Sequence, residues 1–552
     1  VAVIYLEAVQ SFGDETNKDQ ISVAFSDYKD VPADSVFYSV LRLRMGIDGN
    51  RDQVIDLYNP ADRSALFWPN DDRDTRAFSK DGYVEDDLDG SERDCDDDTI
   101  GTSKACIRDL EDFTKLHIEI DRNDSIYKNP DLSLLVKSSG VTVNLFKAVC
   151  DDFSYISQKA VAENQIKAKK LLTVSGTEQE IPLEQFKKNL LPFLLEGCST
   201  GDGQISAFIK YKGNVIAERK IQLKLDPITN FYDFFSLNDI QQTISNVMSN
   251  ARRATYQPSS NDYILYVHGW NMQPYEKTRW TETMFKRLWW QGYDGRVGAF
   301  AWPTLTEGAI TTGGTYNDSE FRAWHSGKVL KDLFGQLGNH KLSVLAHSMG
   351  NVVTSEALKQ YGGKINAYVS SQAAVPARCY EGAPASTSYI NKHLDYYGEY
   401  PVDTPPKPYF YGLKGKASYL IRMMNAKDFA LAMWEGNNAL KPKVLGPYSY
   451  SEKDGVGYFY RRESLIPDQK VELTFPDNTY EIFAFILSAQ TGTIGAEPAP
   501  IPWFININLA AAHLGKYDYR HYSHSRQFRS NLIDEFGYWR TIINECKLTL
   551  VP

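Results

Sequence analysis

The segment that most constrains the fold runs from Lys341 to Tyr361 and reads KLSVLAHSMGNVVTSEALKQY. Its first part is an apolar run typical of a buried strand, and its last part has the spacing of a helix that two glycines end. Between them Ser348 occupies a sharp strand-to-helix turn, and Gly350 leaves room for close backbone approach. Such a turn exposes a serine hydroxyl and aims a helix N-terminus at it, which favours developing negative charge. The segment therefore predicts a nucleophilic serine on an α/β sheet.

Residues 236–552 continue this pattern, because apolar strands alternate with longer helical segments as in parallel α/β sheets. The expected strands are 263–269, 297–303, 341–348, 366–372, 418–424 and 481–488. Two insertions, about 378–417 and 439–480, are rich in Pro, Gly and Tyr. Loops of this length in a compact domain are usually functional, so we expect lid-like segments.

Residues 1–235 have a different pattern, with short β-rich runs separated by acidic and turn-forming loops. This spacing predicts an antiparallel, sandwich-like domain. The expected strands include 35–45, 116–120, 141–146 and 204–213, and one helix is expected at 182–197. The chain thus divides into a β-rich N-terminal domain and an α/β domain.

Charge and cysteine usage narrow the setting of this 552-residue chain. Its formal net charge of −10 argues against nucleic acid as the main partner, because phosphate binding needs a basic face. No apolar run approaches the roughly 18 residues that span a bilayer, and the first ten residues lack the basic start of a signal peptide. Six cysteines permit disulfides, first Cys95 with Cys106 and less clearly Cys150 with Cys198. We expect an exported protein, with a cytoplasmic location as the alternative.

A hydrolytic serine needs backbone N–H groups that stabilise an oxyanion. The sequence LYVHGWN ends an earlier expected strand, at the place where the second donor belongs in this architecture. We assign the oxyanion hole to the N–H groups of Trp270 and Met349, with Asn271 as the alternative to Trp270.

The serine also needs a base and an acid, which follow it in the order acid then histidine. Asp428 lies just past an expected strand, and Asp403 and Glu435 are weaker candidates for the acid. His524 precedes an amphipathic helix in a loop that suits a proton-transferring base, and His521 is its rival.

Residues from about 261 to 539 resemble an α/β-hydrolase of the serine esterase and lipase class. They are most similar to a bacterial group with the landmarks VHGWN, AWP, LAHSMGN, NAKDFAL and HSRQF. The resemblance implies an acyl-enzyme mechanism in which Ser348 attacks, His524 carries the proton and Asp428 orients the imidazole. It implies ester hydrolysis without a catalytic cofactor, on a small-molecule, lipid or polymer ester.

Other interpretations stay open. We expect His268 and His347 to be structural, because histidines at strand ends commonly hydrogen-bond neighbouring loops. The same fold would also suit a lipase or an acyltransferase. A catalytically inactive, exported binding or adhesion protein is the rival from another class.

The acidic stretch DGNRDQVID places Asp48, Asn50, Asp52 and Asp56 at the first, third, fifth and ninth positions of a calcium loop. However, Gln53 replaces the usual glycine, and Asn59 stands where a bidentate glutamate would be. A longer acidic run follows, whose carboxylates repel one another unless calcium or solvent compensates them. The candidate ligands of a structural calcium ion are Asp48, Asn50, Asp52, Asp71, Asp72 and Asp74.

Overall fold

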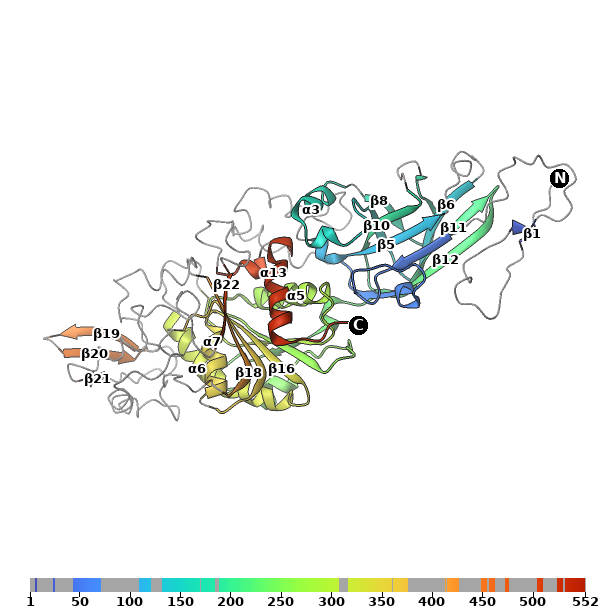
Figure 1. Ribbon diagram of the computed structural model, residues 1–552. Helices are drawn as coiled ribbons and strands as arrows, with labels where there is room; N and C mark the ends of the chain where they lie inside the picture. The colour runs from blue at the N-terminus through green and yellow to red at the C-terminus, as the bar shows by residue number, and fades with distance from the viewer. Residues whose placement is uncertain are drawn as a thin grey trace, which may run out of the picture.

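The computed structural model of the protein is drawn as a ribbon in Figure 1. The structure describes residues 5–6, 23–24, 43–70, 109–120, 132–168, 170–183, 188–306, 316–359, 361–375, 413, 415–425, 448–453, 456–461, 472–475, 504–509, 524–529 and 532–551.

Two five-stranded sheets dominate the described part of the N-terminal region. One has the order β3-β5-β10-β7-β8 and is antiparallel throughout. The other has the order β4-β12-β11-β6-β9 and is antiparallel except between β4 and β12. Ile118 and Leu195 of the first sheet share one buried cluster with Ile205 and Ile221 of the second, as in a sandwich. The strand-rich N-terminal region is therefore confirmed.

The elements of this region have the following bounds. The strands are β3 (Leu43–Ile47), β4 (Ser64–Phe67), β5 (Phe113–Ile120), β6 (Leu132–Ser139), β7 (Val143–Lys147), β8 (Lys170–Val174), β9 (Gln179–Glu180), β10 (Leu190–Gly197), β11 (Gly201–Tyr211) and β12 (Asn214–Leu225). The helical turns are η3 (Pro60–Arg63), η6 (Asp109–Asp112), η7 (Ser154–Ile156), α3 (Lys159–Gln165) and η9 (Ile228–Asn230). A separate pair joins β1 (Tyr5–Leu6) to β2 (Val23–Ala24).

The helix expected at 182–197 is wrong, because residues 190–197 form strand β10. This strand pairs with β5 on one side and β7 on the other, and all but its first residue are buried. A continuous apolar run fits a buried strand as well as a buried helix, so its two neighbours decide its conformation.

The second region is built on a seven-stranded parallel sheet with the order β13-β15-β14-β16-β17-β18-β22. Its strands are β13 (Tyr232–Ser236), β14 (Asp262–Val267), β15 (Arg296–Ala301), β16 (Lys341–His347), β17 (Ile365–Ser371), β18 (Ala417–Met424) and β22 (Ile505–Asn508). Its helices are α4 (Ile244–Ser249), α5 (Pro274–Trp289), α6 (Tyr316–Gln336), α7 (Gly350–Lys359), α12 (Arg526–Arg529) and α13 (Leu532–Cys546). The division predicted at residue 235 falls within β13.

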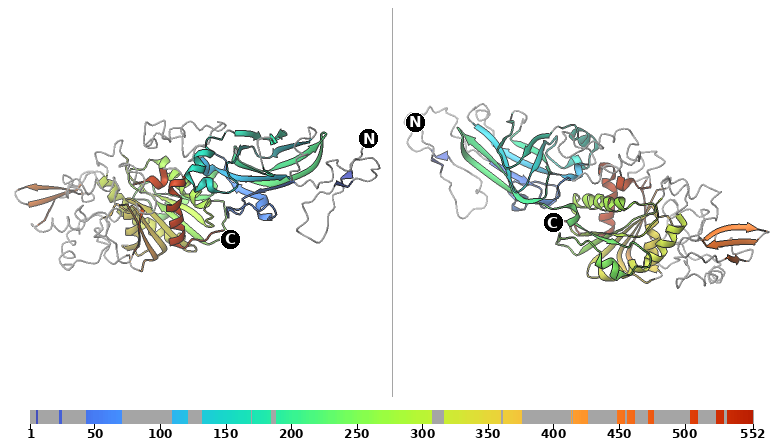
Figure 2. Two further views of the ribbon diagram at one scale, coloured as in Figure 1. Left: turned by 45° about the horizontal axis from the view of Figure 1, so that its top comes forward. Right: turned by 180° about the vertical axis from the view of Figure 1, so that it is seen from behind.

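Helices cover both faces of the parallel sheet, as Figures 1 and 2 show. Helices α5 and α13 pack on one face, and α4, α6 and α7 pack on the other. Alternate residues of β14 divide accordingly, since Ile264 and Tyr266 belong to the first buried cluster while Tyr263, Leu265 and Val267 belong to the second. This three-layer arrangement is the α/β architecture that the alternating sequence pattern predicted.

Two expected features lie largely outside the described residues. Of the strand 481–488 nothing is described. In the second insertion the described part is a three-stranded antiparallel sheet of β19 (Tyr448–Lys453), β20 (Val456–Arg461) and β21 (Glu472–Phe475). The lid role of both insertions stays a prediction.

The two regions share a single core. The cluster that fills the sandwich continues through Trp68 to the α5–α13 face of the parallel sheet. The Trp68 ring lies edge-on to Phe285 and Trp289 of α5, at centroid distances of 5.4 and 5.8 Å. Arg51 reaches across the same junction, where its guanidinium lies 3.7 Å from the Trp289 ring centre and donates to the carbonyl of Tyr293. The sandwich therefore packs directly on the helix layer.

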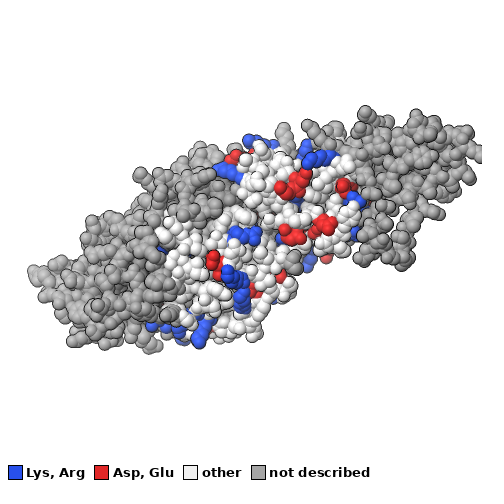
Figure 3. Space-filling model, in the orientation of Figure 1, with Lys and Arg blue, Asp and Glu red and all other residues white. Residues whose placement is uncertain are grey.

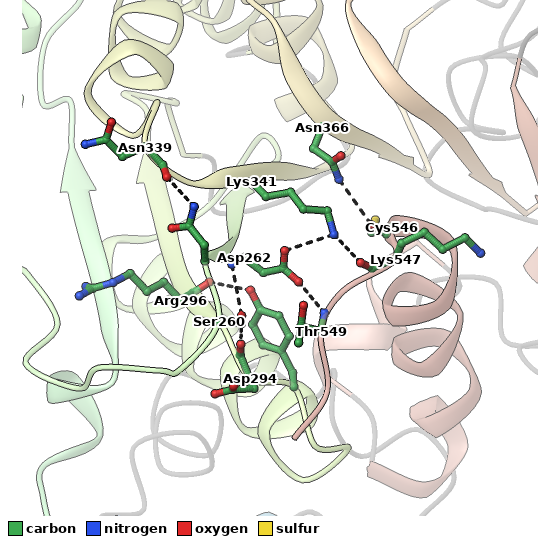
Figure 4. Close-up of polar contacts among 12 residues, drawn as sticks. Ser260, Asp262, Asp294, Arg296, Asn339, Lys341, Asn366, Cys546, Lys547 and Thr549 are labelled. Carbon is green, nitrogen blue, oxygen red and sulfur yellow. Dashed lines mark hydrogen bonds and ion pairs between the residues drawn. The ribbon is translucent and has the colours of Figure 1, made fainter. Parts of the chain in front are cut away.

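The amino ends of the parallel strands are closed by the C-terminal segment (Figure 4). Lys341, which begins β16, forms an ion pair of 3.2 Å with Asp262, which begins β14. Lys341 also donates to the carbonyl of Lys547, and Asp262 accepts from the N–H of Thr549. These contacts leave the opposite, carboxyl edge of the sheet for the candidate site.

The expected pairing of Cys150 with Cys198 is wrong, because both are free thiols in the structure. Cys198 pairs with Thr142 at one end of the antiparallel β7–β10 ladder, and Cys150 lies beyond its other end. At about 3.3 Å per residue the two thiols are much too far apart to bond. Cys95 and Cys106 lie outside the described residues.

Two surface properties bear on possible partners. On the described surface in Figure 3, acidic and basic side chains are interspersed among uncharged ones. No helix within the described ranges is long and apolar enough to cross a bilayer.

Candidate active site

Ser348 lies in the turn between β16 and α7, at the carboxyl edge of the sheet. Its φ is +52°, a left-handed conformation that residues with a side chain seldom adopt. A β-carbon on Gly350 would lie 2.3 Å from the carbonyl oxygen of Val267, and one on Gly269 would lie 2.8 Å from the Ser348 β-carbon. The turn thus packs tightly against the end of β14, as the sequence predicted for a nucleophile elbow.

Asn351 braces this turn, which sequence reasoning missed. Its side-chain amide donates to the carbonyl of Ala346 at 3.0 Å and to that of Ser348 at 2.9 Å. Its side-chain oxygen accepts from the hydroxyl of Tyr368 at 2.7 Å. The N–H of Ser348 donates to the carbonyl of Ser371 in β17. These bonds fix the strained backbone, while the Ser348 hydroxyl itself has no hydrogen-bond partner among the described residues.

His347 connects the turn to the segment that carries His524. Its Nε2 lies 2.7 Å from the carbonyl oxygen of His524, and the two rings are 4.8 Å apart. Burial, followed by the nearby His524, holds the pKa of His347 well below its usual value, so the ring is neutral. A carbonyl only accepts, so Nε2 carries the proton and donates. The structure therefore places His524 beside the residue that adjoins Ser348.

Aromatic contacts hold α12, the helix that follows His524, in place. Phe528 of α12 stacks on Trp280 of α5, with ring centres 4.8 Å apart and planes 6° from parallel. Both rings also contact His347, at 5.4 Å for Phe528 and 5.7 Å for Trp280. Phe528 is fully buried, whereas His524 is partly exposed. His524, the candidate base, thus has a partly exposed side chain next to a closely packed helix.

The segment expected to complete the oxyanion hole follows β14. His268 stacks on Trp302 at 5.3 Å, and the Trp302 indole donates to the carbonyl of His268. Lys277 donates to the carbonyl of Trp302, and burial lowers the pKa of Lys277 to about 8. Burial, followed by the Lys277 charge, also lowers the pKa of His268 well below its usual value. His268 is thus buried and neutral, and its structural role stays a prediction.

The candidate oxyanion donors lie at the carboxyl edge of the parallel sheet, as Ser348 does. Met349 directly follows Ser348 and is buried, and its N–H has no backbone acceptor among the described residues. Trp270 is partly buried against the α6–α7 face. The N–H of Asn271 already donates to the hydroxyl of Thr304 at 3.3 Å, which disfavours Asn271 as the donor.

The remaining catalytic candidates lie outside the described residues. Asp428 lies outside them; β18 ends at Met424, and its carboxyl end is level with that of β17. His521 also falls in a part of the chain that is not described. The choice between His524 and His521, and the identity of the acid, stay predictions.

The predicted calcium loop connects β3 to η3. Gln53 has a φ of +66°, the conformation that glycine normally supplies at this position of a calcium loop. Asn50 and Asp52 are instead engaged with each other and with nearby backbone N–H groups. Asn59 accepts from the N–H of Ala61 and starts η3.

Asp62, which the sequence reasoning did not name, interacts electrostatically with Asp48. Each of the two has a buried carboxylate oxygen without a hydrogen bond. Burial and repulsion from Asp52 and Asp62 raise the pKa of Asp48 to about 7, and burial raises that of Asp62 to about 6. No three metal-binding side chains converge within the described ranges, and Asp71, Asp72 and Asp74 lie outside them. Calcium binding stays a prediction.

The sheet order, the turn at Ser348 and a family match define the class of protein. Residues 247–375, from within α4 to just after β17, match the family described as "Alpha/beta hydrolase of unknown function (DUF900)". This part of the chain, residues 247–375, therefore belongs to the α/β-hydrolase superfamily. No curated protein matches it.

Solved structures with some likeness to the chain include three hydrolases. An extracellular α/β-hydrolase from a Paenibacillus species is 15% identical, with a TM-score of 0.15, and the match covers 26% of this chain and 55% of that one. The epoxide hydrolase CorEH is 12% identical, with a TM-score of 0.14, and the match covers 43% and 65%. A thermostable esterase is 10% identical, with a TM-score of 0.23, and the match covers 74% and 94%. No conclusion about the substrate rests on them.

Proposed function

We propose that this protein is a serine hydrolase that cleaves carboxylic esters through an acyl-serine intermediate. The observation that carries the proposal is the contact between His347 and the backbone of His524. This contact joins the segment of a candidate base to a strained strand-to-helix turn that bears a serine. A serine in such a turn, with a histidine segment held beside it, has the two groups that nucleophilic catalysis requires.

In the proposed reaction the hydroxyl of Ser348 attacks the ester carbonyl while His524 accepts its proton. Asp428 orients the imidazole, and the N–H groups of Met349 and Trp270 stabilise the oxyanion. His524 then protonates the leaving alcohol, and a water molecule, activated by the same histidine, releases the acid and restores the serine. We further propose that the insertions 378–417 and 439–480 form the walls of the acyl site. We also propose that the protein is exported.

Turnover of p-nitrophenyl esters from acetate to palmitate tests this proposal. The purified protein should hydrolyse at least one of them, and Ser348→Ala and His524→Gln should each lower kcat by a factor of about 10³ or more. His521→Gln is the matched control and should stay near the wild-type rate. A steep rise in rate above the solubility limit of the substrate would indicate a lipase. A folded wild-type protein without turnover would contradict the proposal and favour the inactive binding protein.

A further inference from the structure

Besides the hydrogen bond from His347, the segment of His524 accepts a second hydrogen bond, from Arg287 of α5. Arg287 Nη1 donates to the carbonyl oxygen of Gln527 at 2.7 Å, three residues after His524. Arg287 and Gln527 are both completely buried. Together with the bond from His347, this contact holds carbonyls on both sides of the turn at Ser525 that begins α12.

Arg287 is in turn held by the N-terminal sandwich. Its Nε lies 2.9 Å from a carboxylate oxygen of Glu111, and Glu111 is 1% exposed. Glu111 belongs to η6, the turn that leads directly into β5 of the first sheet. The indole of Trp290, just after α5, donates to the Glu111 carbonyl and fixes the backbone there. A chain of direct contacts therefore runs from the sandwich through Arg287 to the histidine segment.

We infer that the N-terminal sandwich contributes to catalysis, because its residue Glu111 positions the segment of His524 through Arg287. This inference rests on the proposed function for its catalytic part. A buried guanidinium without its carboxylate is strongly disfavoured, so loss of Glu111 would displace Arg287 and release the carbonyl of Gln527. Glu111 and Arg287 are positioning residues, and neither needs to touch the substrate.

The chain offers a matched control one residue further on. Lys286 and Asp112 form a second buried ion pair between α5 and η6, and Asp112 also accepts from the indole of Trp68. Removing Asp112 loosens the same junction and also leaves a buried cation, but it leaves the bond between Arg287 and Gln527 in place.

Hydrogen exchange and kinetics of the full chain separate the two roles. Glu111→Ala and Arg287→Met should raise amide exchange of residues 524–529, including the Phe528 N–H that donates to Ser525, at least about tenfold. On the best ester, kcat should fall about tenfold or more while KM changes little, because a displaced base affects the chemical step. Asp112→Ala should lower the melting temperature by a similar amount without either effect. Arg287→Lys, which keeps the charge but not the fork of donors, should be intermediate.

Each outcome decides a separate question. Unchanged exchange at 524–529 in Glu111→Ala, or an equal increase in Asp112→Ala, would overturn the inference. Faster exchange with unchanged kcat would overturn its catalytic part. If the wild-type protein has no activity, the proposed function fails, and the exchange measurement alone still tests the coupling. If Glu111→Ala does not fold, Glu111→Gln removes the charge and keeps an acceptor oxygen.

Discussion

The backbone at Ser348 is strained because it must turn sharply from β16 into α7 within two residues. A residue with a side chain in the left-handed region costs about 1–3 kcal/mol. The amide of Asn351, which donates to carbonyls on both sides of the turn, offsets part of this cost. The result is a serine that its neighbours fix in one position, as a nucleophile requires.

The bond from His347 should matter for rate more than for folding. His347→Phe keeps an aromatic ring in contact with Trp280 and Phe528 but cannot donate to the carbonyl of His524. We expect kcat to fall by about 10- to 100-fold, since a small misplacement of the base is costly. His347→Gln keeps a donor at similar reach and should recover most of the rate. Equal rates for all three proteins in ester turnover would contradict this role.

Gly350 should tolerate no side chain. Gly350→Ala would drive a methyl group to 2.3 Å from the carbonyl of Val267, so we expect a loss of about 1–3 kcal/mol or more in the free energy of unfolding. Gly335→Ala in α6 is the control, because no atom lies within 4 Å of the added carbon. It should be neutral or stabilising in urea unfolding. A wild-type stability for Gly350→Ala would show that the turn can relax.

At the scale of single residues, the sequence predicted the turn at Ser348 but not the side chains that hold it in place. Ser348 and Gly350 stand out because the elbow is a local arrangement of one strand, one turn and one helix. Asn351 and Asp62 were missed because their roles depend on atoms that folding brings close. His347 was expected to hydrogen-bond a neighbouring loop, but its partner lies 177 residues away and no local pattern reveals it.

At the scale of single elements, two carboxyl groups are buried away from water. Asp48, in the loop between β3 and η3, and Asp62, in η3, are both buried. Gln53 of the same loop donates to the carbonyl of Trp290, just after α5. Both carboxyls have raised pKa values, so the folded state holds their protons more tightly than the unfolded state does.

The stability of the protein should therefore fall as the pH rises through this window. The contribution of Asp48 is complete below about pH 4 and is lost as the pH approaches 7, at a cost on the order of 2–4 kcal/mol. Asp48→Asn should flatten this part of the profile, measured by urea unfolding in the presence of EDTA. If calcium binds here, millimolar calcium should restore the wild-type protein at pH 7 but not Asp48→Asn. A flat wild-type profile between pH 4 and 7 would contradict the burial of this charge.

Helices and strands were predicted correctly where the residues of the segment itself were enough to identify them. The strands β14 to β18 are short apolar runs, and each was found within a few residues. The central strand β10 was mistaken for a helix, and β13 and β22 were missed. The conformation of these segments depends on neighbouring strands more than on their own residues.

One of the two buried clusters in the described part of the molecule crosses between the two regions. Trp68 contributes from the sandwich, and Phe285 and Trp289 contribute from α5. The charged pairs of Glu111 with Arg287 and Asp112 with Lys286 lie beside this aromatic contact and are buried. Such a junction is not visible in sequence, because its members are more than 170 residues apart.

We expect the two regions to unfold together. A shared core makes each region the packing surface of the other, so calorimetry should record one transition. Trp68→Ala should lower its midpoint by removing about 3–5 kcal/mol of packing. Two resolved transitions, with only the earlier one shifted by Trp68→Ala, would show that the regions are independent.

The central claim is that Ser348 is a nucleophile, and labelling with a fluorophosphonate probe tests it most directly. Intact-mass and peptide analysis of the folded wild-type protein should reveal one adduct, on the peptide that contains Ser348, and Ser348→Ala should acquire none. A folded wild-type protein that stays unlabelled, or an adduct on another residue, would contradict the account.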